Sequence, residues 1–456
     1  MHARVVIAGL SGDSGKTLVS LGLLASWRRA GRVVAAFKEG PDYIDAAWLG
    51  WAAGGVARNL DTYLMGERAV RDACAWHARA ADLSLIEGNR GLFDGVDASG
   101  SASTAALARL LEAPVVLVLG ITKMTATAAA LVRGCQSLDP AVRLAGVILN
   151  RVASARQERV VRAAIEAACD VPVLGALPRL DDDLLPGRHL GLVTPAEHPQ
   201  LAGIGASLAA IVDAHVDVGR IAALARTAPP LPLPAPPAAA SGQPVRVGFF
   251  QDSAFTFYYP ENLEALEAEG ARLEPISALG ATRLPPVDLL YIGGGFPETH
   301  AAALSANSAL RGEVREAATR GLPIYAECGG LMYLAETLRL PGREYPMSGV
   351  LPVVVDVAHR PAGHGYCEVA VDAPNPFFPV GATFRGHEFH YSRVAPGRER
   401  VASAYAVKRG TGCSGGRDGL TRHNVLASYT HLHASGAAGW ARDLCRRALE
   451  RARTQA

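Results

Sequence analysis

The segment that most constrains this chain is a glycine-rich loop near the N-terminus, residues 9–17, with the sequence GLSGDSGKT. An apolar run at residues 5–8 enters the loop, and an apolar-periodic segment at residues 18–27 leaves it. This order of strand, glycine-rich turn and helix start is typical of a phosphate-binding loop. Glycines let backbone N–H groups crowd around phosphate oxygens, and the helix N-terminus adds the positive end of its dipole. The loop therefore predicts a nucleotide site.

Side chains of the same loop fit ATP and Mg²⁺. We expect the Lys16 ammonium to reach the terminal phosphates and the Thr17 hydroxyl to hold the metal. The spacing is one residue longer than usual, since Leu10 stands where glycine is expected and Gly9 takes its place. A glycine-rich turn with a solvated Lys16 is the alternative. Asn150 follows a predicted strand and either presents its amide to an adenine edge or forms a turn. The predicted nucleotide-binding residues are Gly12, Asp13, Ser14, Gly15, Lys16, Thr17 and Asn150.

Length and composition divide the chain and exclude some partners. At 456 residues it exceeds the usual size of one domain. A proline-rich stretch at residues 227–244 favours a stiff, extended linker. We therefore predict domains at residues 1–226 and 245–456. The formal net charge is +2 and there is no dense basic run, so nothing points to nucleic acid.

Hydropathy and cysteine spacing indicate the compartment. No apolar segment approaches the ~20 residues that span a bilayer, and the short N-terminal apolar run leads into the loop rather than into a signal-peptide cleavage site. The seven cysteines are scattered without Cys-x-x-Cys pairs, which argues against a zinc site or a disulfide framework. We expect a cytoplasmic protein that acts on small molecules, without a membrane or nucleic-acid partner. A homodimer is compatible with this composition.

Strands and helices alternate in both predicted domains, which predicts an α/β fold with mostly parallel sheets flanked by helices. Ligands in such sheets bind at the carboxyl ends of the strands. Strands of the first domain are predicted at residues 32–37, 83–86, 114–119, 145–149 and 171–176. Those of the second are predicted at residues 245–250, 287–292 and 322–326, then near 349–357, 366–371, 401–407 and 424–429, before a C-terminal helix at about 436–453.

Four carboxylates are expected at the carboxyl edge of the first sheet, beside the phosphate loop. Asp42 and Asp45 follow one predicted strand, and Glu87 and Asp94 follow another. Mg²⁺ takes oxygen ligands, often one or two carboxylates together with phosphates and water. Glu87, at the tip of its strand, is the first candidate ligand and Asp42 the second. Asp42, Tyr43, Asp45 and Asp94 form the predicted substrate site. Helix caps and solvated turn residues are the alternative for all of them.

Cys328 is the candidate nucleophile of the second domain. It stands between a buried strand and a Gly-Gly helix start, which is the arrangement of a nucleophile elbow. A helix N-terminus lowers the pKa of a thiol, and the thiolate is the nucleophile. Backbone N–H groups of Gly294, Gly295 and Gly329 are predicted to bind an oxyanion. A buried core cysteine is the alternative.

A general base for Cys328 is predicted near the C-terminus. His431 and His433 follow the predicted strand at residues 424–428 and alternate onto one face, so either can pair with the thiol. The segment at residues 385–392, RGHEFHYS, is dense in polar groups but matches no metal-binding spacing. It binds an acidic substrate, orients the active site or forms a solvated loop, and the sequence leaves these three open.

Together these motifs resemble the cobyrinic/hydrogenobyrinic acid a,c-diamide synthase family. The resemblance covers essentially the whole chain, as a dethiobiotin-synthetase-like ATPase domain followed by a class I glutamine amidotransferase domain. The segments at residues 40–45 and 385–392 are its most specific marks. The full set is GLSGDSGKT (9–17), KEGPDYID (38–45), RNLD (58–61), EGNRGLFDG (87–95), ECGGLMYL (327–334), RGHEFHYS (385–392) and YTHLH (429–433).

The resemblance implies a reaction and its residues. Glutamine is hydrolysed at Cys328 through a thioester, with His431 as the base. ATP phosphorylates an acetate side chain of a corrin acid, and ammonia displaces the phosphate, once at position c and once at position a. The usual acidic third member of such a triad is not evident, since Leu432 and His433 follow His431. The resemblance assigns the carboxylates to the synthetase site: Asp42, Asp45, Glu87 and Asp94.

Two alternatives to this function stay open. A sister tetrapyrrole amidase, such as cobyric acid synthase or the enzyme that amidates nickel sirohydrochlorin, would share both domains, although residues 40–45 favour the a,c-diamide branch over cobyric acid synthase. A partitioning-type ATPase switch belongs to a different class, and Cys328 with its domain argues against it. The sequence does not decide whether the corrin carries cobalt, although a composition rich in Ala, Arg and Gly favours the metal-free acid.

Overall fold

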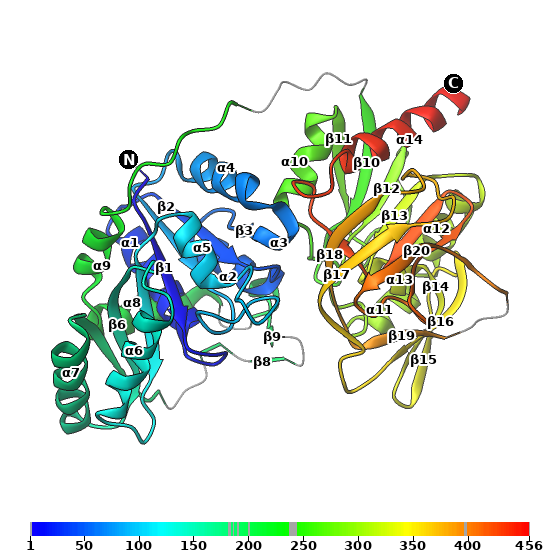
Figure 1. Ribbon diagram of the computed structural model, residues 1–456. Helices are drawn as coiled ribbons and strands as arrows, with labels where there is room; N and C mark the ends of the chain where they lie inside the picture. The colour runs from blue at the N-terminus through cyan, green and yellow to red at the C-terminus, as the bar shows by residue number, and fades with distance from the viewer. Residues whose placement is uncertain are drawn as a thin grey trace. The chain divides into compact units, whose positions relative to one another are not determined.

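A computed structural model describes residues 2–180, 184–185, 187–188, 191–198, 201–236, 244–395 and 399–455. The chain divides into two compact units (Figure 1). The first unit holds Met1–Thr62 and Gly66–Ala235, and the second holds Tyr63–Met65 and Pro236–Ala456. Within the predicted linker, residues 227–236 carry no helix or strand, and residues 237–243 lie outside the described residues.

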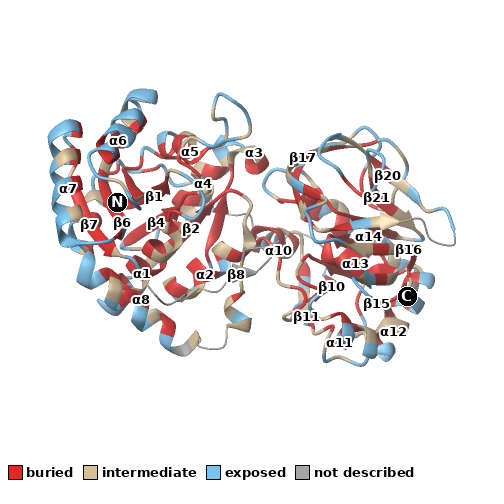
Figure 2. Ribbon diagram, turned by 90° about the horizontal axis from the view of Figure 1, so that it is seen from below, coloured by how far each residue is buried: buried red, intermediate tan, exposed pale blue. Residues whose placement is uncertain are grey.

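The first unit is built on a sheet of seven parallel strands in the order β3-β2-β4-β1-β5-β6-β7. Every residue of the central strands β1 and β4 is buried, as a sheet covered on both faces requires (Figure 2). A two-stranded antiparallel hairpin, β8 (Gly187–Arg188) and β9 (Gly191–Leu192), stands apart from this sheet. The sheet strands are β1 (Arg4–Gly9), β2 (Val34–Glu39), β3 (Arg58–Leu60), β4 (Leu83–Glu87), β5 (Val115–Gly120), β6 (Leu144–Val152) and β7 (Val173–Pro178).

Helices cover this sheet, and α1 is central because it leads from the glycine-rich loop into the core. It packs on β1 and β4 and on the helices α8 and α9. Gly22 permits the close approach of α8, because a Cβ atom there would lie 2.2 Å from Val212 Cγ2. The helices of this unit are α1 (Lys16–Arg29), α2 (Tyr43–Ala53), α4 (Glu67–Ala78), α5 (Thr104–Leu110), α6 (Thr127–Leu138), α7 (Ala155–Cys169), the 3₁₀ helix at Pro195–Glu197, α8 (Leu201–His215) and α9 (Val218–Ala225). The short helix α3 (Thr62–Met65) begins at the last residue of the first segment, and its other residues belong to the second unit.

The second unit has a ten-stranded sheet in which the strand direction changes part of the way across. The strands β11-β10-β12-β13-β22 run parallel, and β21-β20-β17-β18-β23 continue the sheet antiparallel. The parallel strands are β10 (Val245–Phe250), β11 (Ala271–Ile276), β12 (Leu289–Ile292), β13 (Ile324–Glu327) and β22 (Val425–Ser428). The antiparallel strands are β17 (Gly363–Val371), β18 (Thr383–His390), β20 (Ala402–Arg409), β21 (Arg417–Arg422) and β23 (His431–Leu432).

Alternation along the parallel strands separates two hydrophobic cores. In β12, Tyr291 faces a core shared with α14, whereas Leu290 and Ile292 face a core shared with α12 and α13. The same parity in β13 puts Tyr325 with Tyr291 and puts Ala326 with Ile292. The helices are α10 (Pro260–Ala268), α11 (Ala301–Ala306), α12 (Ser308–Thr319), α13 (Gly329–Leu334) and α14 (Trp440–Gln455), and a four-stranded sheet adds β14 (Ala335–Leu340), β15 (Arg343–Pro346), β16 (Leu351–Val357) and β19 (Ser392–Ala395).

The predicted α/β fold is confirmed, and the antiparallel part of the second sheet is what the sequence did not reveal. The segment at residues 385–392 belongs to this part. It forms most of β18, and His387, Glu388 and His390 are buried, so the solvated-loop alternative is wrong. No helix in the described part of the chain is long and apolar enough to cross a membrane.

Candidate active site

The glycine-rich loop joins β1 to α1 and leaves the start of the helix open. The N-cap residue Gly15 has φ 90°, a left-handed conformation, and no side chain caps the first N–H groups of α1. Asp13 also has a positive φ of 56°. Uncapped N–H groups at a helix N-terminus form an anion site. The hydroxyl of Ser14 is buried without a hydrogen-bond partner in the described residues, which adds a polar group for a phosphate to satisfy.

Asn150 lies under this loop rather than apart from it. Its Nδ2 donates to the Ser14 carbonyl at 2.9 Å, and its Oδ1 accepts from the Arg151 N–H at 2.8 Å. A Cβ atom added at Gly15 would lie 2.1 Å from Asn150 Nδ2, so the loop can contact Asn150 only with glycine at that position. The amide therefore supports the loop, and an additional contact with adenine stays a prediction.

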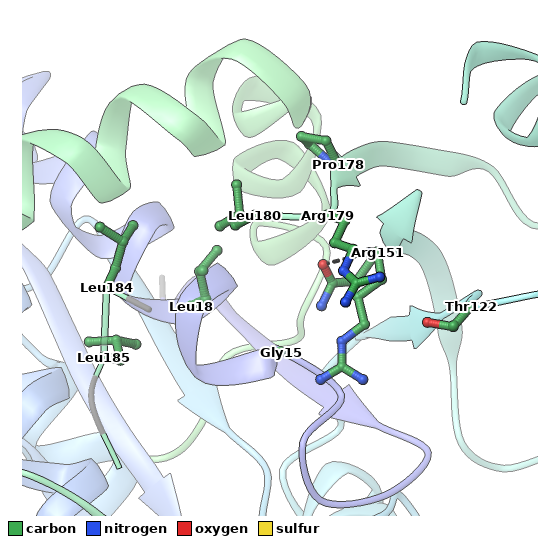
Figure 3. Close-up of a pocket in the computed structure, with 10 residues that line it drawn as sticks. Gly15, Leu18, Thr122, Arg151, Pro178, Arg179, Leu180, Leu184 and Leu185 are labelled. Carbon is green, nitrogen blue, oxygen red and sulfur yellow. Dashed lines mark hydrogen bonds between the residues drawn. The ribbon is translucent and has the colours of Figure 1, made fainter. Parts of the chain in front are cut away.

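Among the described residues, two hollows that border the loop stand out. The larger has a volume of about 460 Å³ and is shown in Figure 3. Gly15 and Leu18 line it from the start of α1, and the guanidinium of Arg151 points into the same region (Figure 3). Its other lining residues are Thr122, Asn150, Pro178, Arg179, Leu180, Leu184 and Leu185. The smaller hollow, of about 270 Å³, lies against the loop residues from Leu10 to Ser14. An apolar cavity with a few polar groups beside a phosphate loop suits a nucleotide base.

Lys38, Glu87 and Thr17 lie together at the carboxyl edge of the first sheet. Lys38 pairs with Glu87 across β2 and β4, so both side chains lie on one face of the sheet. The Lys38 ammonium donates to Glu87 Oε1 at 2.9 Å and to the Gly88 carbonyl at 3.1 Å. The Thr17 hydroxyl donates to the same Glu87 oxygen at 2.9 Å. Glu87 is thus shared between a threonine of the phosphate loop and a buried lysine.

A second carboxylate, Asp45, completes the pairing of Lys38, with Oδ2 2.7 Å from the ammonium. Burial alone would lower the pKa of Lys38, but the carboxylates of Asp45 and Glu87 outweigh it and raise the pKa. For Lys16 the balance is the opposite: burial, and then the positive charge of Lys38, lower its pKa, and the nearby carboxylate charges only partly offset them. The sequence motif at residues 38–45 contained Lys38, but no role was predicted for it. Its position at the end of an apolar strand could have revealed a role for Lys38, because lysine is rarely buried without a charged partner.

The other predicted carboxylates serve as local caps in this structure. Asp42 is the N-cap of α2, and its Oδ1 accepts the N–H groups of Ile44 at 2.7 Å and Asp45 at 2.8 Å. Burial, and next the negative charge of Asp45, raise the pKa of Asp42 to about 6. Asp94 is exposed and accepts the Gly91 N–H at 2.9 Å. Tyr43 begins α2 beside Asp42. Capping is compatible with substrate binding, and those roles stay predictions.

The oxygen atoms around Thr17 fit Mg²⁺. The Thr17 hydroxyl and Glu87 are already adjacent, and Glu87 Oε2 is buried with no hydrogen-bond partner among the described residues. No group of three or more His, Cys, Asp or Glu side chains in that part of the chain is arranged to hold a metal alone. Mg²⁺ needs only one or two carboxylates when phosphates and water supply its other ligands. Thr17 and Glu87 are therefore the residues that would hold it.

Glu39, beside this cluster, is a buried acid on the opposite face of β2. Its Oε2 accepts the Asn89 N–H at 2.6 Å and the Thr104 hydroxyl at 2.8 Å. Burial raises the pKa of Glu39 to about 7, although these hydrogen bonds act in the opposite direction. The Glu39 carboxyl therefore changes charge near neutral pH in the folded protein.

In the second unit, Cys328 occupies a strained turn between β13 and α13. Its φ of 45° and ψ of −94° are unusual for a residue with a side chain. The Cys328 N–H donates to the Ser428 carbonyl at 2.7 Å, and the Cys328 carbonyl accepts the Met332 N–H at 3.0 Å. The strand on one side and the helix on the other hold the residue in this conformation, as in a nucleophile elbow.

The expected effect of the helix N-terminus on the Cys328 thiol is not what the structure gives. Burial, and next the negative charge of Glu298, raise the pKa of Cys328, and the opposing interaction with the Gly329 N–H is smaller. The short helix α13 does not offset the loss of water around the thiol of Cys328, a residue that is only 6% exposed. Cys328 therefore requires a base to become a nucleophile.

The predicted oxyanion glycines are packed closely around the elbow. A Cβ atom at Gly329 would lie 3.1 Å from the Gly295 nitrogen, and one at Gly295, with φ 155°, would lie 2.1 Å from the Ala254 carbonyl oxygen. The Gly294 carbonyl accepts the N–H groups of Thr256 and Phe257, both at 3.1 Å. Gly295 therefore has no room for a side chain and Gly329 has little, and both bring backbone close to the elbow. Their binding of an oxyanion stays a prediction.

His431 pairs with Glu327, the residue directly before the nucleophile. His431 Nδ1 lies 3.4 Å from Glu327 Oε2, and both side chains are buried. The Glu327 carboxylate also accepts the hydroxyls of Tyr325 at 2.9 Å and Tyr291 at 3.2 Å, which share its face of the sheet. The Leu432 N–H, at 3.2 Å, completes its shell. The sequence did not reveal an acidic partner for His431 because one was looked for in the residues that follow the histidine. In the structure the partner is Glu327, the residue before Cys328.

His433 has a different set of partners from His431. Its Nδ1 accepts the Ser435 N–H at 3.2 Å, and its Nε2 lies 3.6 Å from Glu261 Oε2. Of the two candidate bases, only His431 is paired with an acid adjacent to Cys328. His433 is therefore paired with Glu261 instead of Glu327.

A phosphate-binding loop with Thr17 beside Glu87, and a strained elbow at Cys328 preceded by a glutamate that pairs with His431, are the arrangement expected of a two-domain glutamine amidotransferase with a nucleotide-dependent domain. Residues 5–192 match the CobQ/CobB/MinD/ParA nucleotide binding domain, and residues 246–439 match the CobB/CobQ-like glutamine amidotransferase domain. The chain belongs to the cobyrinate a,c-diamide synthase family, and it is a glutamine-dependent, amide-forming ligase of cobalamin biosynthesis.

Three relatives illustrate the match, each named cobyrinate a,c-diamide synthase. The protein of Magnetococcus marinus is 45% identical over 97% of this chain and 96% of its own length. That of Dehalococcoides mccartyi is 42% identical over 94% and 95%. That of Archaeoglobus fulgidus is 40% identical over 98% of both chains. The predicted family is thereby confirmed.

The raised pKa of Glu39 predicts a pH-dependent stability that Glu39→Gln removes. The folded protein keeps a proton on Glu39 up to about pH 7, whereas the ordinary value is 4.5, so stability falls as pH rises through this window. The loss is at most about 3 kcal/mol at ~1.4 kcal/mol per pH unit. We expect Glu39→Gln to melt higher than the parent at about pH 8 and similarly at about pH 5.

Melting temperatures of both proteins across this pH range provide the test. The raised pKa of Asp42 also makes stability fall as pH rises, but it does so equally in the parent and in Glu39→Gln, so it cancels when the two proteins are compared. Glu67→Gln, at an exposed position of α4, is the matched control and should track the parent. Equal melting temperatures for Glu39→Gln and the parent at every pH would contradict the account.

Proposed function

We propose that the chain amidates the a- and c-acetate side chains of a corrin acid, with glutamine as nitrogen donor and ATP forming acyl phosphate intermediates. Residues 1–226 are the proposed synthetase domain and residues 245–456 the proposed amidotransferase domain, joined by the linker at 227–244. The observation that carries the proposal is the pairing of His431 with Glu327 next to Cys328, in a chain that also has the Thr17–Glu87 edge. A partitioning-type switch has no use for such a thiol site.

Glutamine hydrolysis follows from the elbow. His431 takes the proton of the Cys328 thiol, whose raised pKa keeps it protonated until the base acts. The thiolate attacks the amide carbon, and backbone N–H groups around Gly294 and Gly329 stabilise the oxyanion. His431 returns the proton to the departing ammonia, which leaves a thioester on Cys328. Water then hydrolyses the thioester to glutamate, and Glu327 stabilises the charged imidazole in both steps.

Amide formation follows from the carboxyl edge of the first sheet. Lys16 and the N–H groups at the start of α1 bind the ATP phosphates and stabilise the charge that moves during transfer. An acetate oxygen of the corrin attacks the terminal phosphorus of ATP, and ADP leaves as the bond to its β-phosphate breaks. Ammonia then attacks the acyl carbon of the acyl phosphate, and phosphate leaves. Mg²⁺ bound at Thr17 and Glu87 would neutralise part of the negative charge of the phosphates. Asp45 and Asp94 are proposed to position the substrate or ammonia.

The corrin is proposed to be cobyrinate or its metal-free counterpart, hydrogenobyrinate. The names of the relatives favour cobyrinate, whereas composition favoured the metal-free acid. Assaying both acids side by side at equal concentration distinguishes them, because the preferred acid should show the larger kcat/KM for diamide formation.

Cys328→Ala should separate the two activities. We expect glutamine-dependent amidation to fall at least about a hundredfold, while amidation driven by added ammonium salt stays within about threefold of the parent, because the thiol serves only ammonia release. Diamide formation with each nitrogen source, followed by mass spectrometry, provides the measurement. Cys445→Ala removes another buried thiol of the second unit and should retain both activities. Glutamine hydrolysis by Cys328→Ala would exclude the nucleophile assignment.

Glu87→Gln and Asp94→Asn should differ in their dependence on Mg²⁺. Glu87 contacts Thr17 at the proposed metal position, whereas Asp94 accepts a turn N–H elsewhere in its loop. We expect Glu87→Gln to need at least about fivefold more Mg²⁺ for half-maximal synthesis, and Asp94→Asn to synthesise less at a near-normal Mg²⁺ requirement. Titrations of Mg²⁺ against diamide formation measure this, with glutamine hydrolysis at Cys328 as the check on folding. Superimposable Mg²⁺ curves for Glu87→Gln and the parent would remove Glu87 as a ligand.

A further inference from the structure

A second histidine lies directly opposite His431 in the sheet. Strands β18 and β23 pair antiparallel, with His387 opposite His431 and Gly386 opposite Leu432. Side chains of opposite residues on antiparallel strands lie side by side on one face. The two imidazole rings are stacked, with centroids 4.8 Å apart and an angle of 17° between their planes. His387 therefore covers one face of His431.

The residue before His387 permits this contact. A Cβ atom at Gly386 would lie 2.6 Å from the His431 carbonyl oxygen and 2.6 Å from Thr430 Cγ2. Any side chain at Gly386 would therefore push β23 away from β18. The Gly-His pair of the segment at residues 385–392 thus brings the strand with His431 close and presents a flat ring to it.

Tyr259 fixes the orientation of His387. The Tyr259 hydroxyl lies 3.2 Å from His387 Nδ1, and both side chains are buried. Tyr259 is itself held in place, as it is the N-cap residue of α10 and its ring packs on His433 at a centroid distance of 4.6 Å. His387 is thereby anchored on the side away from His431.

The environment keeps His387 uncharged. Burial, and then the charges that His431, His433 and His364 would carry, hold its pKa well below the ordinary value. The Tyr259 hydroxyl also faces it. A neutral ring beside His431 does not repel the imidazolium that forms when His431 takes a proton, and its π face attracts that cation.

We propose that His387 is a positioning residue for His431 in glutamine hydrolysis. The His431 ring is bounded on three sides: Glu327 lies at Nδ1, Gly294 lies close to Cε1, and His387 covers a face. These contacts leave the ring one orientation. The inference rests on the proposed roles of Cys328 and His431, and it gives a function to a histidine for which the sequence left three readings open.

Two substitutions at His387 test the stacked ring. His387→Leu removes the planar face, and His387→Phe retains it while losing the hydrogen bond with Tyr259. For glutamine hydrolysis we expect His387→Leu to lower kcat about tenfold, with KM within about twofold of the parent. The acidic limb of its kcat/KM profile should move at least about half a unit to lower pH, because His431 loses a group that stabilises its charged form. His387→Phe should recover most of kcat and the parental pH profile.

A matched control distinguishes positioning from packing. His390 is a buried histidine of the same strand that stacks on Tyr429, with centroids 3.7 Å apart. His390→Leu should lower the melting temperature while leaving the pH profile in place. If His387→Leu does not fold, His387→Asn replaces it, as it also lacks a ring.

The outcomes separate this inference from the proposed function. A parental kcat and pH profile in His387→Leu would overturn the inference, as would equal losses in His387→Phe and His387→Leu or the same pH shift in His390→Leu. Failure of the proposed function shows differently, as glutamine hydrolysis that survives Cys328→Ala. If Cys328→Ala loses glutamine hydrolysis but the His387 variants keep the kcat and pH profile of the parent, only the inference about His387 is overturned.

Discussion

The first unit depends on one buried charge, the Lys38 ammonium between Glu87 and Asp45. A phosphate site needs carboxylates to hold a metal, yet carboxylates at the end of buried strands repel each other and the phosphates. Lys38 balances this charge from within the sheet. Removing one partner of a buried ion pair typically costs about 3–5 kcal/mol because the remaining charge is left uncompensated. The same ammonium fixes Glu87 beside Thr17, so charge balance and metal geometry have a common origin.

The second unit solves a different problem, which is to activate a thiol that burial disfavours as an anion. Because side chains alternate along β13, Glu327 lies on the same face of the sheet as Tyr325 and Tyr291. Cys328 follows at the end of the strand, in the turn that leads into α13. The short strand β23 then brings His431 to Glu327 from the antiparallel half of the sheet. The parallel half thus provides the proposed nucleophile and acid, and the antiparallel half provides the proposed base.

Local patterns predicted much of this arrangement. The phosphate loop, the strands that precede the acidic loops and the elbow at Cys328 are encoded in contiguous stretches, where apolar runs and glycines act over a few residues. Pairings set by register were not accessible. Lys38 meets Glu87 because β2 and β4 are neighbours, and His387 meets His431 because β18 pairs with β23. The pKa of Cys328 was predicted in the wrong direction because the helix dipole is a local property, whereas burial depends on the whole fold.

The central claim is that nitrogen released from glutamine at Cys328 becomes the amide nitrogen of the corrin. The most direct test supplies glutamine labelled with heavy nitrogen in its side-chain amide, together with ATP, Mg²⁺ and cobyrinate or hydrogenobyrinate. Mass spectrometry then follows the label in the product. The account predicts a diamide in which both new amides carry the label, with one ATP consumed for each. A product without label, or glutamate formed with no amidated corrin under these conditions, would contradict it.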